Sequence, residues 1–192
     1  MTKIKICGLM TSQDIAAVNR AQADLAGFIF AKGRHQIDLT TALKLRQRLD
    51  PTIPSVGVFV NAPLTEMIQA FDSGAISIIQ LHGQEDETVV KALQERQIPV
   101  IQVFKPTSKP QTNANYLMFD SGAGNGTLVD WKKSSVKSKQ PLIIAGALDI
   151  TNVQAAIKTI KPAYVDLSRG VETDGHKDPK KVSEIVSLVH QL

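Results

Sequence analysis

Residues 55–83, SVGVFVNAPLTEMIQAFDSGAISIIQLHG, contain a short apolar run, a helical pattern and a second short apolar run. In both runs, residues 55–60 and 76–81, apolar side chains occupy consecutive positions instead of every second one. Such runs are typical of strands that are covered on both faces, as in a parallel sheet. Between them, Pro63 suits the first turn of a helix and Gly74 suits its end. The stretch therefore predicts two parallel strands joined by a helix.

The same alternation continues along the whole chain. Six further strands are predicted at residues 3–7, 25–30, 99–104, 116–120, 141–146 and 163–168. Further helical patterns occupy residues 12–23, 38–50, 85–97, 149–161 and 177–192. The segment after the fifth strand has two prolines and no apolar stripe, so we expect a loop or a stunted helix there. The helical pattern after the sixth strand, at 126–136, is weak.

Eight strands that alternate with helices, with no linker between them, predict an α/β fold in a single domain over residues 1–192. The count favours a closed (β/α)₈ TIM barrel with short loops and a reduced or missing fifth helix. A doubly wound open sheet is the alternative, and it normally shows a glycine-rich phosphate turn after its first strand. The sequence ICGLMTS at 6–12 is not such a turn.

The composition indicates the cellular compartment in which the protein is expected. Hydrophobic residues make up 43% and charged residues 21% of the 192 positions, as in an ordinary globular protein. A single cysteine cannot form an internal disulfide, and no run resembles a signal peptide or is long enough to span a bilayer. We therefore expect a cytoplasmic protein without a membrane partner.

The net charge of +4 raises the question of a nucleic-acid partner. Basic residues are scattered, however, and only two Tyr and one Trp are available to stack on bases. We therefore expect no nucleic-acid binding. A modest positive field is equally suited to steering small anionic substrates.

Polar side chains collect where the predicted strands end, which is where a barrel of this kind carries its chemistry. Cysteine alone is usually a buried core residue, Asp120 could shape a turn, and His82 could be a satisfied core histidine. Their convergence on one rim favours a functional site instead. The candidates are Cys7, Arg34, His35, His82, Asp120 and Asp166.

Two turns suggest a phosphate site. IIAGAL at 143–148 ends the seventh strand with small residues around Gly146, which allow backbone N–H groups to approach an anion. VDLSRGVET at 165–173 ends the eighth strand with Ser168 and Gly170. These loops commonly hold phosphate in this fold, although tight turns need small residues in any case.

At these same residues the chain resembles the phosphoribosylanthranilate isomerase family of tryptophan biosynthesis. The matching motifs, in order, are KICGL, GFIFAKGRHQI, VGVFVN, IQLHG, FDSGAGNGTLVDW, IIAGAL and VDLSRGVETDGHKDPKKV. The resemblance implies a (β/α)₈ barrel that acts without metal or organic cofactor. It also implies a small phosphorylated, carboxylated substrate, N-(5-phosphoribosyl)anthranilate, which an Amadori rearrangement converts to 1-(2-carboxyphenylamino)-1-deoxyribulose 5-phosphate.

That reaction needs an acid for the furanose ring oxygen and a base for the C2′ proton. By resemblance, Cys7 is the base and Asp120 is the acid, so we expect a lowered thiol pKa and a raised carboxyl pKa. The resemblance also implies that Asp166 orients the substrate and that His82 lines the middle of the site. The phosphate contacts that it implies are Gly146, Ser168 and Gly170.

Two positions depart from the family pattern. The arginine that holds the anthranilate carboxylate is replaced by His35, while Arg34 stands one residue earlier. Because arginine offers a fixed bidentate fork that neutral histidine lacks, we favour Arg34 over His35 as the anchor. Ala147 stands where a second glycine is common, and we expect a negative φ at this alanine.

The sequence allows three other interpretations. A histidine-pathway sugar isomerase typically has aspartate at the ends of strands one and six, which Cys7 argues against. Indole-glycerol-phosphate synthase would need lysines at several strand ends, and they are missing here. A barrel that binds ligands without catalysis is the alternative from another class. The sequence leaves open whether the chain is a monomer or a homodimer.

Overall fold

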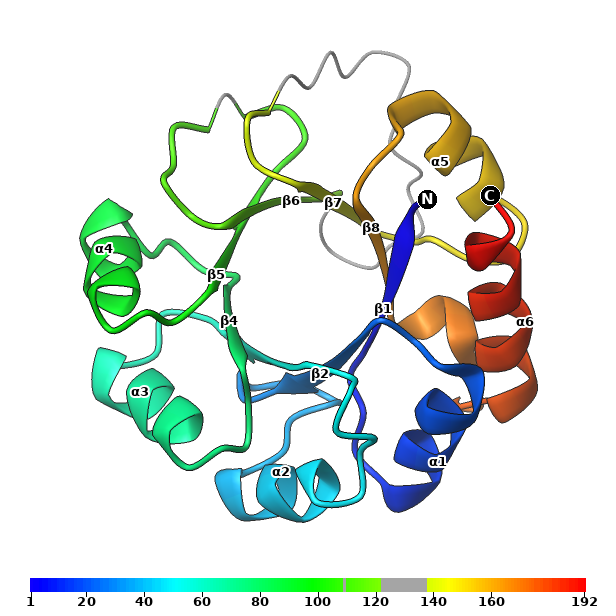
Figure 1. Cartoon of the computed structure of the whole chain (residues 1–192), viewed down its shortest axis with the longest axis horizontal. Coiled ribbons are helices and arrows are strands. Elements are labelled where there is room, and N and C mark those ends of the chain that lie inside the picture. Colours follow the sequence, from blue (N-terminus) through cyan, green and yellow to red (C-terminus); the bar gives the residue numbers. More distant parts are fainter. Residues whose placement is uncertain (109, 122–137) are drawn as a thin grey trace.

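A computed structural model describes residues 1–108, 110–121 and 138–192. Its eight parallel strands pair in chain order and close into a barrel, with the helices arranged around the outside (Figure 1). The predicted TIM-barrel architecture is therefore confirmed. The strands are β1 (Lys3–Cys7), β2 (Leu25–Ile29), β3 (Ser55–Phe59), β4 (Ile78–Leu81), β5 (Val100–Phe104), β6 (Tyr116–Asp120), β7 (Leu142–Ala145) and β8 (Tyr164–Leu167).

The helices begin at the residue types expected to cap them. Thr11 and Asp14 form a reciprocal capping box at the start of α1, and three further helices start after a capping aspartate. The helices are α1 (Ser12–Ala21), α2 (Leu39–Arg46), α3 (Leu64–Asp72), α4 (Glu87–Glu95), α5 (Val153–Ile160) and α6 (Pro179–His190). Within the described part of the segment between β5 and β6 there is no helix, as predicted. The weak helical pattern at 126–136 lies outside the described residues.

Alternate residues of each strand supply two separate cores. One set packs between the strands and the surrounding helices, as Ile4 and Ile6 do on β1. The other set fills the barrel interior, where Lys5 and Cys7 share the inward face of β1. The apolar interior residues are Leu25, Val56, Ile78, Ile101, Met118, Ile143 and Ala145.

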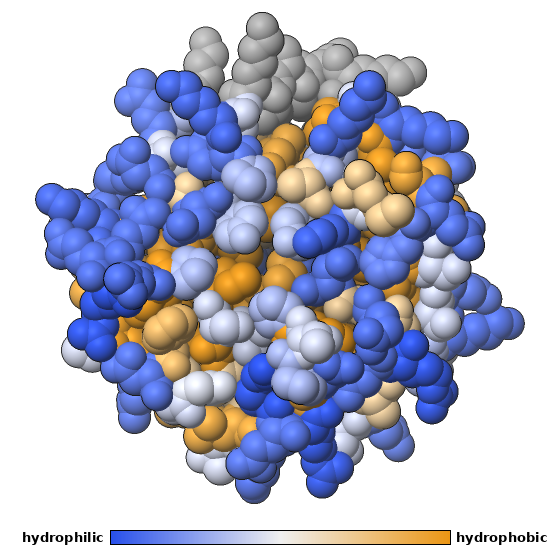
Figure 2. All heavy atoms as spheres, viewed as in Figure 1, coloured by the Kyte–Doolittle hydropathy of each residue, from blue (hydrophilic) through white to orange (hydrophobic). Residues whose placement is uncertain are grey.

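Viewed down the barrel axis, hydrophilic residues cover most of the periphery, and apolar residues show between them nearer the centre (Figure 2). Among the described residues, no helix combines the length and apolarity needed to cross a membrane.

A short segment after β8, residues 169–177, forms part of the barrel rim. It consists of the 3₁₀ helix η2 (Arg169–Val171) and the antiparallel pair β9 (Glu172–Thr173) and β10 (His176–Lys177). This hairpin carries Glu172 and Lys177 back to the end of β8, where the Lys177 ammonium donates to the backbone carbonyl of Ser168 at 3.0 Å. Two charged residues are thereby added to the rim.

Candidate active site

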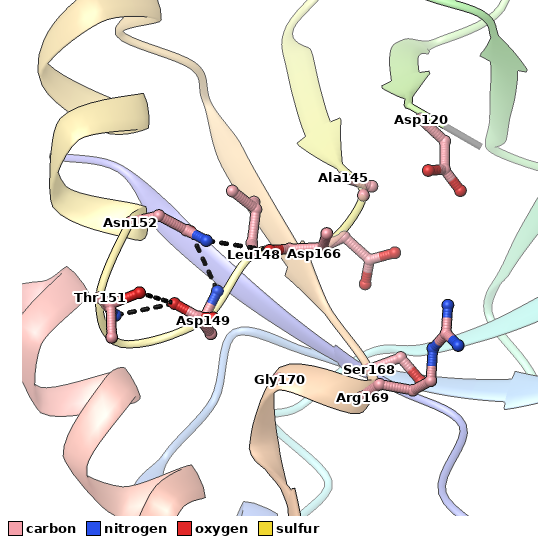
Figure 3. Close-up of a pocket in the computed structure, with 12 residues that line it drawn as sticks. Asp120, Ala145, Leu148, Asp149, Thr151, Asn152, Asp166, Ser168, Arg169 and Gly170 are labelled. Atoms are coloured by element: carbon pink, nitrogen blue, oxygen red, sulfur yellow. Dashed lines mark hydrogen bonds between the residues drawn. The ribbon is translucent and has the colours of Figure 1, made fainter. Parts of the chain in front are cut away.

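A cavity of about 530 Å³ opens at the carboxyl ends of β6, β7 and β8. Figure 3 shows the carboxylates of Asp120 and Asp166 and the guanidinium of Arg169 turned toward the same space. Of the predicted site residues, the wall contains Asp120, Asp166, Gly146, Ser168 and Gly170. The wall does not include the other predicted site residues, which are Cys7, Arg34, His35 and His82. Their contacts with neighbouring side chains are described below.

Cys7 lies at the end of β1 and is 5% exposed. Its neighbour in register on β2 is Gly27, and a Cβ atom there would lie 2.7 Å from the Cys7 sulfur. The glycine therefore makes room for the thiol. Burial raises the pKa of Cys7, while the charge of Lys5 acts in the opposite direction. The expectation of a lowered thiol pKa is therefore wrong for this structure, because the cost of desolvating the thiolate exceeds the help from nearby cations.

Inside the barrel, on the same face of β1 as Cys7, lies a buried ion pair that was not predicted from the sequence. The Lys5 ammonium donates to Asp166 Oδ1 at 2.9 Å, and its side chain is completely buried. A lysine inside an otherwise apolar run is the sequence signal that could have identified it. Asp166, predicted to orient the substrate, therefore also holds a charge inside the barrel.

Asp120 is linked across the rim to His82. The Nε2 atom of His82 lies 3.2 Å from Asp120 Oδ2. On the other side of the ring, Gln80 Nε2 lies 3.1 Å from His82 Nδ1. With the amide of Gln80 donating to Nδ1, the ring proton sits on Nε2 and faces the aspartate. The buried Gln80 thus orients the imidazole, and the imidazole orients Asp120.

The carboxylate of Glu172 contacts three basic side chains at the rim. It contacts the Arg34 guanidinium, His35 Nε2 at 2.8 Å and the Lys177 ammonium at 2.6 Å. Burial alone would raise the pKa of Glu172, but the hydrogen bond and charge of Lys177, with His35 and Arg34, bring it below the usual value. Glu172 and Lys177 are not among the site residues predicted from the sequence, since only the β9–β10 hairpin brings them close to Arg34 and His35.

The turns after β7 and β8 are tightly packed. A Cβ atom on Gly146, whose φ is +100°, would lie 1.8 Å from Ser121 Oγ, and one on Gly170 would lie 2.0 Å from the carbonyl oxygen of Leu148. Both glycines are therefore required by packing, whatever they bind. Arg169 adds a positive charge to this wall.

Ala147 adopts a φ of +50°, so the expected negative φ is wrong. A left-handed conformation costs an alanine roughly 1–2 kcal/mol. The turn is held in place by Asn152, whose side-chain amide donates to the Ala147 carbonyl oxygen at 2.9 Å. This local contact therefore stabilises a backbone conformation that the residue type disfavours.

The closed barrel, with a thiol, carboxylates and a histidine at the carboxyl ends of its strands, defines the class of the chain as a (β/α)₈-barrel enzyme. The sequence profile of N-(5'-phosphoribosyl)anthranilate (PRA) isomerase matches residues 4–188. The chain belongs to this isomerase family.

Individual relatives agree with this assignment. The N-(5'-phosphoribosyl)anthranilate isomerase of Lacticaseibacillus paracasei is 49% identical over 187 residues, covering 97% of this chain and 94% of the relative. The crystal structure of the Thermotoga maritima phosphoribosyl anthranilate isomerase matches with a TM-score of 0.89 at 26% identity, over 100% of both chains. A phosphoribosyl anthranilate isomerase in complex with reduced 1-(o-carboxyphenylamino)-1-deoxyribulose 5-phosphate matches with a TM-score of 0.84 at 25% identity, again over 100% of both chains.

Proposed function

We propose that this chain isomerises N-(5'-phosphoribosyl)anthranilate in tryptophan biosynthesis, with Cys7 as general base and Asp120 as general acid. The cavity at β6–β8 carries the proposal, because it places the carboxyl group of Asp120 in one space with the turns proposed to bind phosphate. A substrate held there by its phosphate has its sugar beside the acid. Such positioning is a large part of enzymatic rate enhancement.

The reaction conserves its protons. Asp120 protonates the furanose ring oxygen as the C1′–O bond breaks, and the anthranilate nitrogen forms an iminium bond to C1′. The Cys7 thiolate then removes the C2′ proton, and the electron pair of that bond forms the C1′–C2′ double bond of an enolamine. Tautomerisation to the ketone transfers a proton from the Cys7 thiol to C1′, while the C2′ hydroxyl loses its proton and Asp120 is protonated again. One acid and one base are sufficient for this sequence.

The phosphate is proposed to bind at the turns after β7 and β8, at Gly146, Ser168 and Gly170. Ser168 accepts a hydrogen bond from the buried Lys177 ammonium, with 3.3 Å between Lys177 Nζ and Ser168 Oγ. This bond fixes the hydroxyl at the mouth of the cavity. Arg169, which lines the same cavity, adds positive charge for a dianion.

For the anthranilate carboxylate we propose Arg34 as the anchor and His35 as a supporting contact. Burial, followed by the charges of Lys177 and Arg34, lowers the pKa of His35 despite Glu172, so the imidazole is neutral near pH 7. The guanidinium of Arg34 stays charged and presents several donors besides the one facing Glu172. Glu172 would orient this fork.

Alanine substitutions at Arg34 and His35 should therefore have unequal effects. Arg34→Ala is expected to lower kcat/KM by about tenfold or more, mainly through KM, because a charge-assisted hydrogen bond contributes about 1.5–3 kcal/mol. His35→Ala should have a smaller effect, and steady-state kinetics of both variants measure the difference. Arg96→Ala is the matched control, since Arg96 pairs with Asp72 on the surface. A larger loss for His35→Ala would transfer the role of anchor to the histidine.

The substrate is a small molecule, no cofactor or nucleic acid takes part, and the chain acts in the cytoplasm as a monomer or homodimer.

Complementation of a tryptophan auxotroph that lacks this isomerase tests the function directly. The parent chain should restore growth without tryptophan, and the Cys7→Ala/Asp120→Asn double variant at equal expression should not. If the parent chain is expressed and folded but growth is absent, the proposed function is wrong. Growth with the double variant would show that the rescue does not come from the proposed acid and base.

A further inference from the structure

Lys5 is a buried charge that the proposed mechanism does not use. Its side chain is 0% exposed inside the barrel, where its register partner on β2 is the apolar Leu25. Burying an ammonium group costs several kcal/mol unless it is paired, and apolar side chains of similar volume are often at least as stabilising as a buried ion pair. The stability of the barrel therefore gives no reason for Lys5 and Asp166 to be charged.

The position of Lys5 relative to Cys7 gives a reason for a charged residue at this place. The two residues are two positions apart on β1, so both side chains point into the barrel. The positive charge of the Lys5 ammonium favours the thiolate form of Cys7. Asp166 is the register partner of Lys5 on β8 and accepts its hydrogen bond at 2.9 Å. The three side chains therefore form one cluster inside the barrel.

The charged groups that act on Cys7 come from three elements: Lys5 on β1, Asp166 on β8 and Lys177 on β10. Lys5 has the larger of the two cationic effects, and Asp166 opposes it less strongly than Lys5 favours the thiolate. Lys177 is paired with Glu172 at 2.6 Å, so its charge is largely compensated. Lys5 is therefore the main group that stabilises a negative charge on the Cys7 sulfur.

We propose that Lys5 is the positioning residue that makes Cys7 a base, its ammonium held by Asp166 and stabilising the thiolate that removes the C2′ proton. This inference rests on the proposed role of Cys7. In that step the C2′ proton passes to the Cys7 sulfur and its bonding electrons pass to the C1′–C2′ bond. Lys5 keeps its own proton throughout, so it contributes a fixed charge and does not transfer a proton.

The ionisation of Cys7 can be measured without the reaction, because Cys7 is the only cysteine in the chain. The rate of alkylation by iodoacetamide, measured against pH, gives the midpoint at which the thiolate forms. In Lys5→Met this midpoint should rise by about one pH unit or more, which is about a tenfold loss of thiolate at a fixed pH below it. Lys3→Met is the matched control, because Lys3 lies on the same strand and is exposed. Its midpoint should equal that of the parent.

A second variant separates the effect of Lys5 from that of an unpaired Asp166. Lys5→Met/Asp166→Asn removes both charges and leaves no buried carboxylate without a cation, which also protects folding. Its midpoint should still lie above that of the parent, since Lys5 has the larger effect on Cys7. Circular dichroism and thermal unfolding verify that each variant is folded.

A folded double variant whose midpoint equals or falls below that of the parent would overturn the proposal. At a fixed pH below the alkylation midpoint, kcat/KM of Lys5→Met should fall in proportion to the loss of thiolate, which a purely structural role of Lys5 would not produce. An active parent chain with unmoved midpoints refutes the role of Lys5 and leaves the isomerase function standing. An inactive parent chain with shifted midpoints refutes the function and confirms the control of the thiol by Lys5.

Discussion

Replacing Cys7 by alanine is expected to lower kcat by about 10³-fold, within the range of about 10²–10⁴ that general acid or base catalysis contributes. The side chain is small and the alanine Cβ occupies the same place beside Gly27, so folding should be preserved. KM should change little, because the thiol is proposed to act on the C2′ proton and not to hold the substrate. Steady-state kinetics of the purified variant, with thermal unfolding as a check on folding, measure this loss.

The pH dependence gives a second measurement of the same role. Burial raises the pKa of Cys7, so only a minor fraction is thiolate near neutral pH. Because Cys7 must be deprotonated and Asp120 must be protonated, kcat/KM of the parent should fall at both low and high pH, which gives a bell-shaped profile. Cys7→Asp, which supplies a different base, should retain more activity than Cys7→Ala. Full activity in Cys7→Ala would remove the thiol from the mechanism.

Asp120→Asn should have an effect of similar size on kcat, about 10²–10⁴-fold, because the amide keeps the shape of the carboxyl group but cannot protonate the ring oxygen. The variant can still accept a hydrogen bond from His82 Nε2, which lies 3.2 Å from Asp120 in the parent. The local geometry should therefore survive. Single-turnover kinetics separate this loss of chemistry from a loss of binding.

His82→Asn is the control for that experiment. It removes the ring that orients Asp120 and leaves the acid in place, so its loss of kcat should be much smaller than that of Asp120→Asn. Equal losses in the two variants would mean that the histidine itself carries the proton. If Asp120→Asn keeps the parent rate, a different group must act as the acid.

Much of the fold could be predicted from local patterns. The consecutive apolar residues at 76–81 indicate a strand buried on both faces, and the structure places β4 at Ile78–Leu81. The two prolines and the absence of an apolar stripe after residue 104 indicate that no regular helix forms there, as observed among the described residues. Both signals are local, because periodicity and proline act on the chain before any tertiary contact forms.

The candidate site was predictable only where position along a strand determines it. Cys7, Asp120 and Asp166 lie at or near strand ends, and parallel strands in a barrel bring those ends to one rim. The β9–β10 hairpin after β8 contains Glu172 and Lys177. Their contacts near Arg34 and His35 therefore depend on how this hairpin folds. Nothing in their local sequence specifies that approach.

The sequence by itself determined a (β/α)₈ barrel, the rim on which its polar residues meet, and a resemblance to one isomerase family. Those features follow from periodicity, turn residues and strand order, which the chain carries at every position. Only the tertiary structure decided the raised pKa of Cys7 and the buried pair of Lys5 with Asp166. Each of these depends on desolvation or on contacts between segments far apart in the chain, and such effects exist only once the barrel has closed.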